Sequence, residues 1–145
     1  MSNIPGKLIV FVSSTFTDLI SERQAAVSAI LKSGHIPAGM ELFTAGDQSQ
    51  MDTIRRWIDQ SDIYMLILGG RYGSLEPKTK LGYTELEYDY AIEAGKPVFA
   101  VVINHDALEV KVREFGTQRW KKRTLKNWRN FEKRFLRIFL HSLMN

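Results

Sequence analysis

The chain has 145 residues, of which 44% are hydrophobic and 25% charged, and this composition excludes a disordered or fibrous protein. It has no cysteine, which excludes disulfides, thiolate metal sites and cysteine nucleophiles. The three histidines, His35, His105 and His141, are scattered, so we expect no zinc site. No apolar run reaches the roughly 20 residues of a bilayer span, and no secretory signal opens the chain. The sequence therefore predicts a cytoplasmic location.

The net charge of +4 conceals an uneven distribution along the chain. Residues 1–110 carry nine Lys and Arg against fourteen Asp and Glu, whereas residues 111–145 carry eleven against two. We therefore expect an acidic domain at residues 1–109, followed by a basic helical extension at residues 110–145.

The first expected strand is Lys7–Val12, a short β-branched run typical of a strand buried on both faces of a parallel sheet. The next segment keeps helical spacing as far as Gly34, a residue type that ends helices in a left-handed conformation. Thr15 and Asp18, three residues apart, predict a capping box at the start of this helix. A second, shorter strand is expected at His35–Leu42.

The second half of the domain repeats this alternation. Gln48–Ser61 predicts a helix, because its apolar residues share one stripe. Ile63–Leu68 is an uninterrupted apolar run, which indicates a central strand. Arg71–Tyr83 is rich in Gly, Pro and Lys and indicates a long exposed loop. Thr84–Ala94 is expected to form the third helix, and Pro97–Ile103 the fourth strand.

Strands that alternate with helices predict a parallel sheet with right-handed crossovers. We therefore expect an α/β fold, a three-layer flavodoxin-like sandwich with a central parallel sheet of four to five strands. The C-terminal extension differs, because aromatic and apolar residues recur there every three or four positions opposite lysines and arginines. This pattern predicts a C-terminal basic amphipathic helix, with an apolar stripe made of Trp128, Phe131, Phe135, Ile138 and Phe139.

Two roles are open for this basic helix. The favoured one is that its apolar stripe packs on the domain or on a partner and leaves the charges in solvent. The alternative is contact with nucleic acid or with an acidic membrane surface, since basic and aromatic residues are interleaved.

Candidate ligand-binding residues follow from the predicted fold. Open parallel sheets bind ligands beyond the carboxyl ends of their strands, near the point where the strand order reverses. Polar, glycine and aromatic residues follow the expected strands at that edge, and we expect them to meet around one nucleotide-shaped cleft. The candidates are Ser13, Ser14, Thr15, Glu41, Gly70, Arg71, Tyr72, Tyr83, Thr84 and Glu87.

Two of these groups have a structural interpretation beside the ligand-binding one. Ser13, Ser14 and Thr15 offer hydroxyls at an expected helix N-terminus, which suits a phosphate or ribose. They suit capping of that helix equally well. Arg71 and Tyr72 suit a phosphate and a flat ring. Alternatively, Arg71 pairs with a carboxylate in a turn and Tyr72 covers the core.

Glu87 is the candidate for a chemical role. A carboxylate in the first turn of a helix is held ionised by the helix dipole, which suits a nucleophile or an electrostatic stabiliser at the anomeric carbon of a sugar. The spacing of Thr84 and Glu87 also fits a capping box, which is a purely structural role. Glu85 is expected to point to a different side of the helix from Glu87.

Four strings, in chain order, carry a resemblance to a known family: VFVSSTFTDLISER, AGMELF, IDQSDIYMLILGGRYGSL and GYTELEYDYAIEAGKPV. Over about residues 7–103 the chain resembles the DUF4062 family, which is regarded as a distant relative of Toll/interleukin-receptor (TIR) domains and nucleoside deoxyribosyltransferases. The resemblance implies a TIR-like fold, placed at the N-terminal end of larger proteins that often carry nucleotide-driven oligomerising domains.

The resemblance also implies residue roles. In the deoxyribosyltransferases, a Gly-Thr-x-x-Glu stretch followed by a Gly-Lys-Pro-Val strand entry carries the nucleophilic glutamate. Set against residues 95–98, that pattern places the threonine at Thr84 and the glutamate at Glu87, with Glu85 as the fallback catalytic residue. Tyr83 stands where the transferases have glycine, a departure that crowds the pocket mouth.

Two functions of different classes are consistent with these observations. The first is a hydrolase of the N-glycosidic bond of NAD or a nucleoside, needing no cofactor and acting as the effector of a defence or signalling protein. The second is a non-catalytic nucleotide-sensing or self-association module. Both imply a small-molecule nucleotide as ligand, and a homo-oligomer or downstream domains as protein partners.

Overall fold

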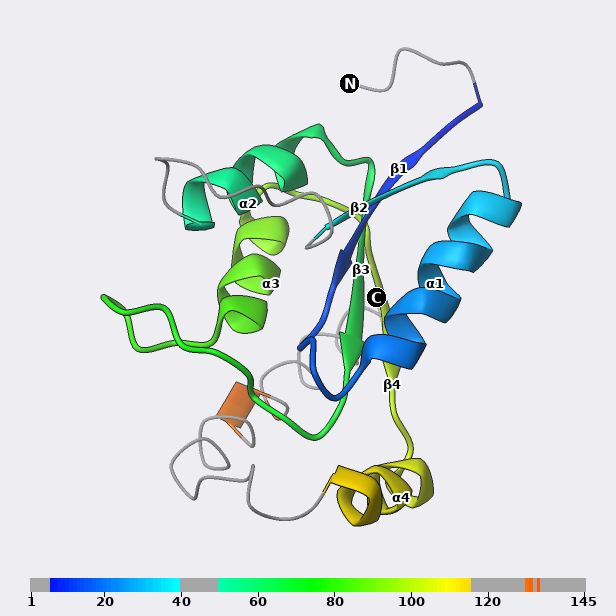
Figure 1. Ribbon diagram of the computed structural model, residues 1–145. Coiled ribbons are helices and arrows are strands. Elements are labelled where there is room, and N and C mark those ends of the chain that lie inside the picture. Colours follow the sequence, from blue (N-terminus) through cyan, green and yellow to red (C-terminus); the bar gives the residue numbers. More distant parts are fainter. Residues whose placement is uncertain (1–5, 40–49, 116–129, 132, 134–145) are drawn as a thin grey trace.

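The computed structural model describes residues 6–39, 50–115, 130, 131 and 133. Its strands are β1 (Ile9–Ser13), β2 (Ile36–Gly39), β3 (Ile63–Leu68) and β4 (Val98–Val102). Its helices are α1 (Ile20–Lys32), α2 (Gln50–Gln60), α3 (Tyr83–Glu93) and α4 (His105–Phe115). The four strands form one parallel sheet in the order β2-β1-β3-β4 (Figure 1). The predicted parallel α/β fold is therefore confirmed.

The helices cover the two faces of this sheet as separate layers. In Figure 1, α1 lies on one side of the strands, and α2 and α3 lie on the other. Side chains alternate along each strand accordingly. Phe11, Tyr64 and Leu66 belong to a core cluster with residues of α2 and α3, whereas Val12 and Ile67 belong to a second cluster with α1. The result is the three-layer sandwich that the sequence predicted.

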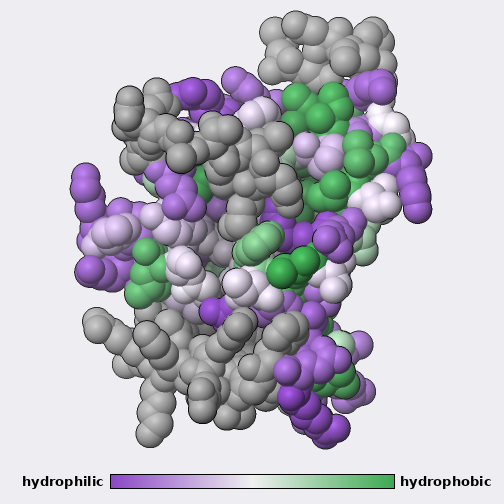
Figure 2. Space-filling model, in the orientation of Figure 1, coloured by the Kyte–Doolittle hydropathy of each residue, from purple (hydrophilic) through white to green (hydrophobic). Residues whose placement is uncertain are grey.

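The position of β1 between β2 and β3 fixes where a ligand can bind. The chain leaves β1 toward β2 on one side and returns to β3 on the other, so the strand order reverses next to β1. All four strands run toward the same end of the molecule, where α3 starts and α4 lies (Figure 1). Surface rich in hydrophobic residues gathers at the opposite end, over the start of β1 and the end of α1, where Leu8, Leu31 and Ile36 are exposed (Figure 2).

Both predicted capping boxes are wrong. Helix α1 begins at Ile20 after Leu19, and no side chain caps it, so Thr15 and Asp18 do not form a capping box. Helix α3 begins at Tyr83 after Gly82, again without a side-chain cap, so Thr84 is already inside the helix. The reason is tertiary packing, which takes these side chains away from the helix ends. Polar residues near both helix starts are buried at the carboxyl edge of the sheet, and several of them, such as Ser13, Ser14 and Glu87, bond to residues of other elements.

Helix α4 was not predicted, and the expected domain boundary at residues 109 and 110 lies inside it. Lys111 ties α4 to the start of α1, because its ammonium donates to the carbonyl oxygen of Asp18 at 2.9 Å and pairs with Glu22 at 2.7 Å. Of the expected apolar stripe, the described residue is Phe131. It is buried and meets Tyr88 edge to face, with ring centroids 5.7 Å apart.

Phe131 thus packs on the body of the domain. The other residues of the stripe, Trp128, Phe135, Ile138 and Phe139, lie outside the described residues. The division into residues 1–109 and 110–145 stays a prediction. Across the part of the chain that the structure describes, no helix has the length and apolar character to cross a membrane.

Candidate functional site

Glu87 lies in the second turn of α3 and is 6% exposed. Ser13, the last residue of β1, donates a hydrogen bond from its Oγ to Glu87 Oε2. Burial raises the pKa of Glu87 from its ordinary 4.5 to about 7, although the Ser13 hydrogen bond and the charge of Arg23 act to lower it. Near neutral pH this carboxyl exchanges between its neutral and ionised forms. Burial therefore opposes the ionised form that the helix dipole was expected to favour.

A buried arginine that the sequence analysis missed completes this part of the site. Arg23 of α1 is 2% exposed, and its Nη1 donates to the carbonyl oxygen of Val12 at 3.0 Å and to Ser14 Oγ at 3.1 Å. It is also the positive charge that acts on Glu87. A signal for it was present in the sequence, because Arg23 stands four residues after the buried Leu19 and so shares the inner face of its helix.

Glu87 forms part of the wall of a pocket of about 160 Å³ at the carboxyl edge of the sheet. The described residues that line it come from the loops after β1 and β3, from the start of α2 and from the first two turns of α3. They are Ser14, Thr15, Phe16, Thr17, Gln50, Arg71, Gly73, Ser74, Tyr83, Thr84 and Glu87. The pocket is smaller than the roughly 300–1,000 Å³ of sites for drug-sized ligands, so it suits a sugar-sized group with the rest of a larger ligand outside.

The three hydroxyls at the end of β1 have different roles. The Ser13 hydroxyl donates its hydrogen bond to Glu87. Ser14 accepts from Arg23 and donates to the carbonyl oxygen of Thr15 at 2.6 Å. Thr15 Oγ1 is buried and has no hydrogen-bond partner among the residues that the structure describes. Thr15 is therefore the hydroxyl of this group with capacity to bind a ligand in the pocket, and none of the three caps α1.

Arg71 combines the two roles considered for it. Its Nη1 donates to Thr17 Oγ1 and lies 3.8 Å from Asp18 Oδ1, so it does pair with a carboxylate. Its side chain is 26% exposed and lines the pocket. A guanidinium has five N–H donors, more than these two contacts use, and it can also bind an anionic group.

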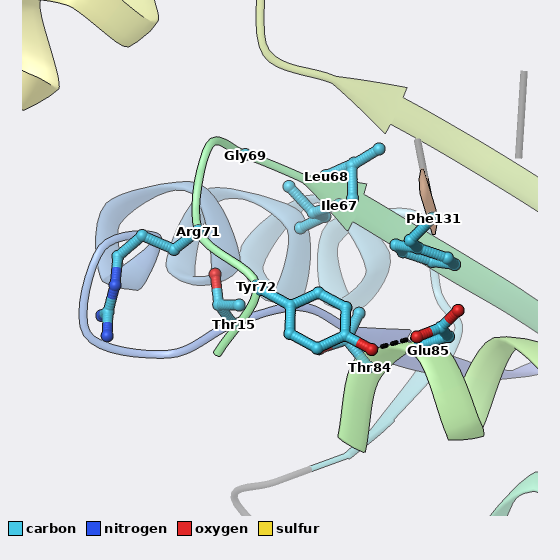
Figure 3. A pocket seen from close by; sticks show the side chains of 9 residues that line it. All are labelled: Thr15, Ile67, Leu68, Gly69, Arg71, Tyr72, Thr84, Glu85 and Phe131. Carbon is cyan, nitrogen blue, oxygen red and sulfur yellow. Dashed lines mark hydrogen bonds between the residues drawn. The ribbon is translucent and has the colours of Figure 1, made fainter. Parts of the chain in front are cut away.

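Tyr72 and Glu85 are not among the described residues that line this pocket. The Tyr72 hydroxyl donates to Glu85 Oε2, and both side chains are buried at a neighbouring recess, which Phe131 also lines and which shares Thr15, Arg71 and Thr84 with the pocket (Figure 3). Figure 3 shows Tyr72 and Glu85 pointing toward each other, while Arg71 points away from them. Tyr72 thus covers the core, which is the structural one of the two roles expected for it. Glu85 faces this recess and Glu87 faces the pocket.

The remaining predicted residues lie elsewhere. Glu41 is outside the described residues. Gly70 is buried after β3 and is not among the described residues that line the pocket. Within the described ranges, no three His, Asp or Glu side chains converge on a point where they could hold a metal ion.

Five described residues that line the pocket were not among the predicted site residues: Phe16, Thr17, Gln50, Gly73 and Ser74. Phe16 is 46% exposed, although an apolar residue next to an expected helix is ordinarily assigned to the core. Gln50 opens α2, which lies beside α3 on one side of the sheet, and it lines the pocket (Figure 1). The position of Gln50 depends on the path of the whole β2–α2 crossover, so no local pattern could have indicated it.

Gly73 holds the loop after β3 close to this pocket, and Gly73→Ala is expected to lower stability by about 1–3 kcal/mol. Its φ of +86° is strained for other residues, and an added Cβ would lie 2.8 Å from Thr15 Cγ2. Gly95→Ala is the matched control, because Gly95 has a φ of +69° but open space around its Cβ position. Thermal and urea unfolding of both variants separate the backbone strain from the contact with Thr15. Equal losses in the two variants would show that this contact costs nothing.

The fold and the site define a parallel α/β domain with a buried, titratable carboxylate in a pocket at the carboxyl edge of its sheet. The chain belongs to the DUF4062 family, a domain of unknown function, whose model matches residues 9–138. The match confirms the resemblance and extends it beyond residue 103.

Two further comparisons complete this picture. The structure is similar to that of the Clostridium botulinum CMP N-glycosidase, BcmB, with 14% sequence identity and a TM-score of 0.43, covering 74% of this chain and 99% of that chain. Among curated proteins, no relative matches this chain.

Proposed function

We propose that this domain binds a nucleotide and hydrolyses its N-glycosidic bond, with NAD or a nucleoside as the substrate class. One observation carries the proposal. Glu87, whose pKa is about 7, forms part of the wall of an open pocket and is oriented there by Ser13. A carboxyl that titrates near the working pH is matched to catalysis, and such groups concentrate at functional sites.

In the proposed reaction, the ionised Glu87 carboxylate acts at the anomeric carbon of the ribose. An oxygen of the carboxylate bonds to or stabilises this carbon as the C–N bond breaks and the base leaves with the bonding electrons. Water then attacks the same carbon, releases the carboxylate and loses its proton to solvent. NAD and water thus give ADP-ribose, nicotinamide and a proton.

The other pocket residues have binding roles in this proposal. Thr15 and Thr84 line the pocket beside Glu87 and would hold the ribose. Arg71 would hold a phosphate at the exposed side. Tyr83, which is half-buried at the pocket wall, would limit the size of the sugar substituent.

The test is release of nicotinamide from NAD, and of free base from a panel of nucleosides and nucleotides, measured chromatographically across pH 5–9. Because the ionised form of Glu87 is required, kcat/KM is expected to rise with pH and to level off above an apparent pKa of about 7. A rate that falls through the same pH range would instead make Glu87 a general acid. The assay is run on the full chain and on forced oligomers, because assembly can be needed for activity.

The second candidate is a non-catalytic nucleotide-sensing or self-association module. The small volume of the pocket favours it, since a whole dinucleotide extends beyond the described walls. Exposed apolar residues on β4, Phe99 and Val101, offer a surface for self-association. Saturable binding of NAD without release of nicotinamide, in the monomer and in forced oligomers alike, would support the sensor and contradict the hydrolase.

A further inference from the structure

Tyr64 of β3 is a buried tyrosine beside Glu87 that the proposed reaction does not use. Its ring stacks on Phe11, with centroids 5.8 Å apart and planes inclined by 9°, and it meets Tyr88 at 6.4 Å. The residue is fully buried. These two ring contacts hold the phenol in one orientation between β1 and α3.

The hydroxyl of Tyr64 is not explained by packing. Its oxygen is buried and makes no hydrogen bond of regular geometry with the residues that the structure describes. An unpaired polar group in the core is costly, and a phenylalanine would keep both ring contacts without that cost. The presence of tyrosine at this position therefore points to a role for the oxygen.

The surroundings of this oxygen indicate the role. In the β1–β3 register Phe11 pairs with Tyr64 and Ser13 with Leu66, so Tyr64 and Ser13 share one face of the sheet. Burial and the charge of Glu87 raise the pKa of the Tyr64 hydroxyl, and a side-chain hydrogen bond with Ser13, close to it but not of regular geometry in this structure, acts to lower it. Tyr88 and Asp89 of α3 also raise this pKa, while Arg23 of α1 acts on Glu87 from the other side of the site. Among the described residues, these are the titratable groups whose charge acts on the pair.

We propose that Tyr64 is a positioning residue for Glu87, whose O–H donates to Ser13 Oγ while Ser13 donates to the ionised carboxylate. A serine hydroxyl has one proton and two lone pairs, so it can donate to Glu87 and accept from Tyr64 at once. Donation to a carboxylate is charge-assisted, and each donor in a chain strengthens the next. Tyr64 therefore favours the ionised form that the proposed reaction needs, and only this consequence for turnover rests on the proposed function.

The experiment is an NMR titration of the Glu87 carboxyl in the full chain labelled with ¹³C-glutamate, with Glu87→Gln to assign the signal. Tyr64→Phe is expected to raise the titration midpoint of Glu87 by about one pH unit, without lowering the thermal unfolding midpoint. Ser13→Ala is expected to raise it as well, and to make a further Tyr64→Phe change silent, because the chain of hydrogen bonds is already broken.

The matched control is Tyr90→Phe, on the same helix as Glu87 but with its hydroxyl bonded to Asp59 at 2.8 Å. It is expected to leave the Glu87 midpoint unchanged. An unchanged midpoint in Tyr64→Phe, or an equal shift in Tyr90→Phe, overturns the inference. If the midpoint shifts as expected but no nucleotide is cleaved, the inference stands and the proposed function fails. If nucleotides are cleaved and the midpoint does not move, the inference alone fails.

Discussion

Glu87→Gln is expected to be more stable than the wild-type protein at pH 8, by about 3 kcal/mol, while losing roughly 10²–10³-fold in turnover of any nucleotide that the wild type cleaves. Gln keeps the size of the side chain and an oxygen that can accept from Ser13. It lacks the charge that burial penalises. Opposite effects on stability and activity at one residue are typical of a functional site.

The sign of the stability effect follows from the raised pKa of Glu87. Below pH 4.5, the ordinary value, the carboxyl is protonated in both the folded and the unfolded chain. Between pH 4.5 and about 7 the unfolded chain loses this proton and the folded chain keeps it, so folding stability falls as the pH rises. Above pH 7 both states are ionised and the loss levels off. The advantage of Glu87→Gln should therefore be small at pH 4.5 and largest at pH 8.

Urea unfolding from pH 4.5 to 8 measures the free energy of unfolding of the wild type and of Glu87→Gln. The titration of most other groups affects both proteins equally and cancels in the difference between them. Glu76→Gln is the control, because its effect on folding stability at pH 8 is expected to have the opposite sign. Glu76 lies half-buried in the loop after β3, and the backbone amides of Thr79 and Lys78 lower its pKa. Its charge therefore stabilises the fold above its ordinary pKa, and its removal should be mildly destabilising at pH 8. A Glu87→Gln protein with no pH-dependent advantage would contradict the burial of a titratable carboxyl at this site.

The sequence was sufficient to predict the order of strands and helices as far as β4, and the sheet edge at which the pocket lies. Ile63–Leu68 was predicted with its observed bounds, because an uninterrupted apolar run of that length fits a central strand. Thr84 and Glu87 were assigned to the pocket edge, and both line the pocket. These assignments depend on patterns of a few residues and on a general rule about parallel sheets.

Contacts between distant elements could not be predicted in this way. The pairing of Ser13 with Glu87 spans 74 positions, and burial at that junction moves the pKa against the local effect of the helix dipole. Tyr72 follows a strand as a ligand-binding residue would, yet it turns inward because Glu85 accepts its hydroxyl proton. Local patterns indicate on which element, and at which end of it, a polar side chain lies. Tertiary packing decides which partner that side chain meets.

Arg23→Met is expected to lower stability by about 2–4 kcal/mol at pH 8. Methionine fills most of the space of the arginine stem but cannot donate to Val12 or Ser14, so the carbonyl oxygen at the end of β1 and the serine hydroxyl lose a buried partner. It also removes the positive charge that lowers the pKa of Glu87. The loss should be smaller at pH 5, where Glu87 is neutral and needs no counter-charge.

The double variant of Arg23→Met with Glu87→Gln separates these two contributions. The double variant still lacks the hydrogen bonds of Arg23, but it has no Glu87 charge for the arginine to act on. Its loss of stability relative to Glu87→Gln should therefore be the same at pH 5 and pH 8. Arg55→Met is the control, because Arg55 is exposed and pairs with Asp52 at 3.2 Å, and its loss should be within about 1 kcal/mol at either pH. If Arg23→Met lost the same stability at both pH values with Glu87 intact, the arginine would act on the β1 end through hydrogen bonds alone. The electrostatic coupling between the first helix and the carboxylate would then be excluded.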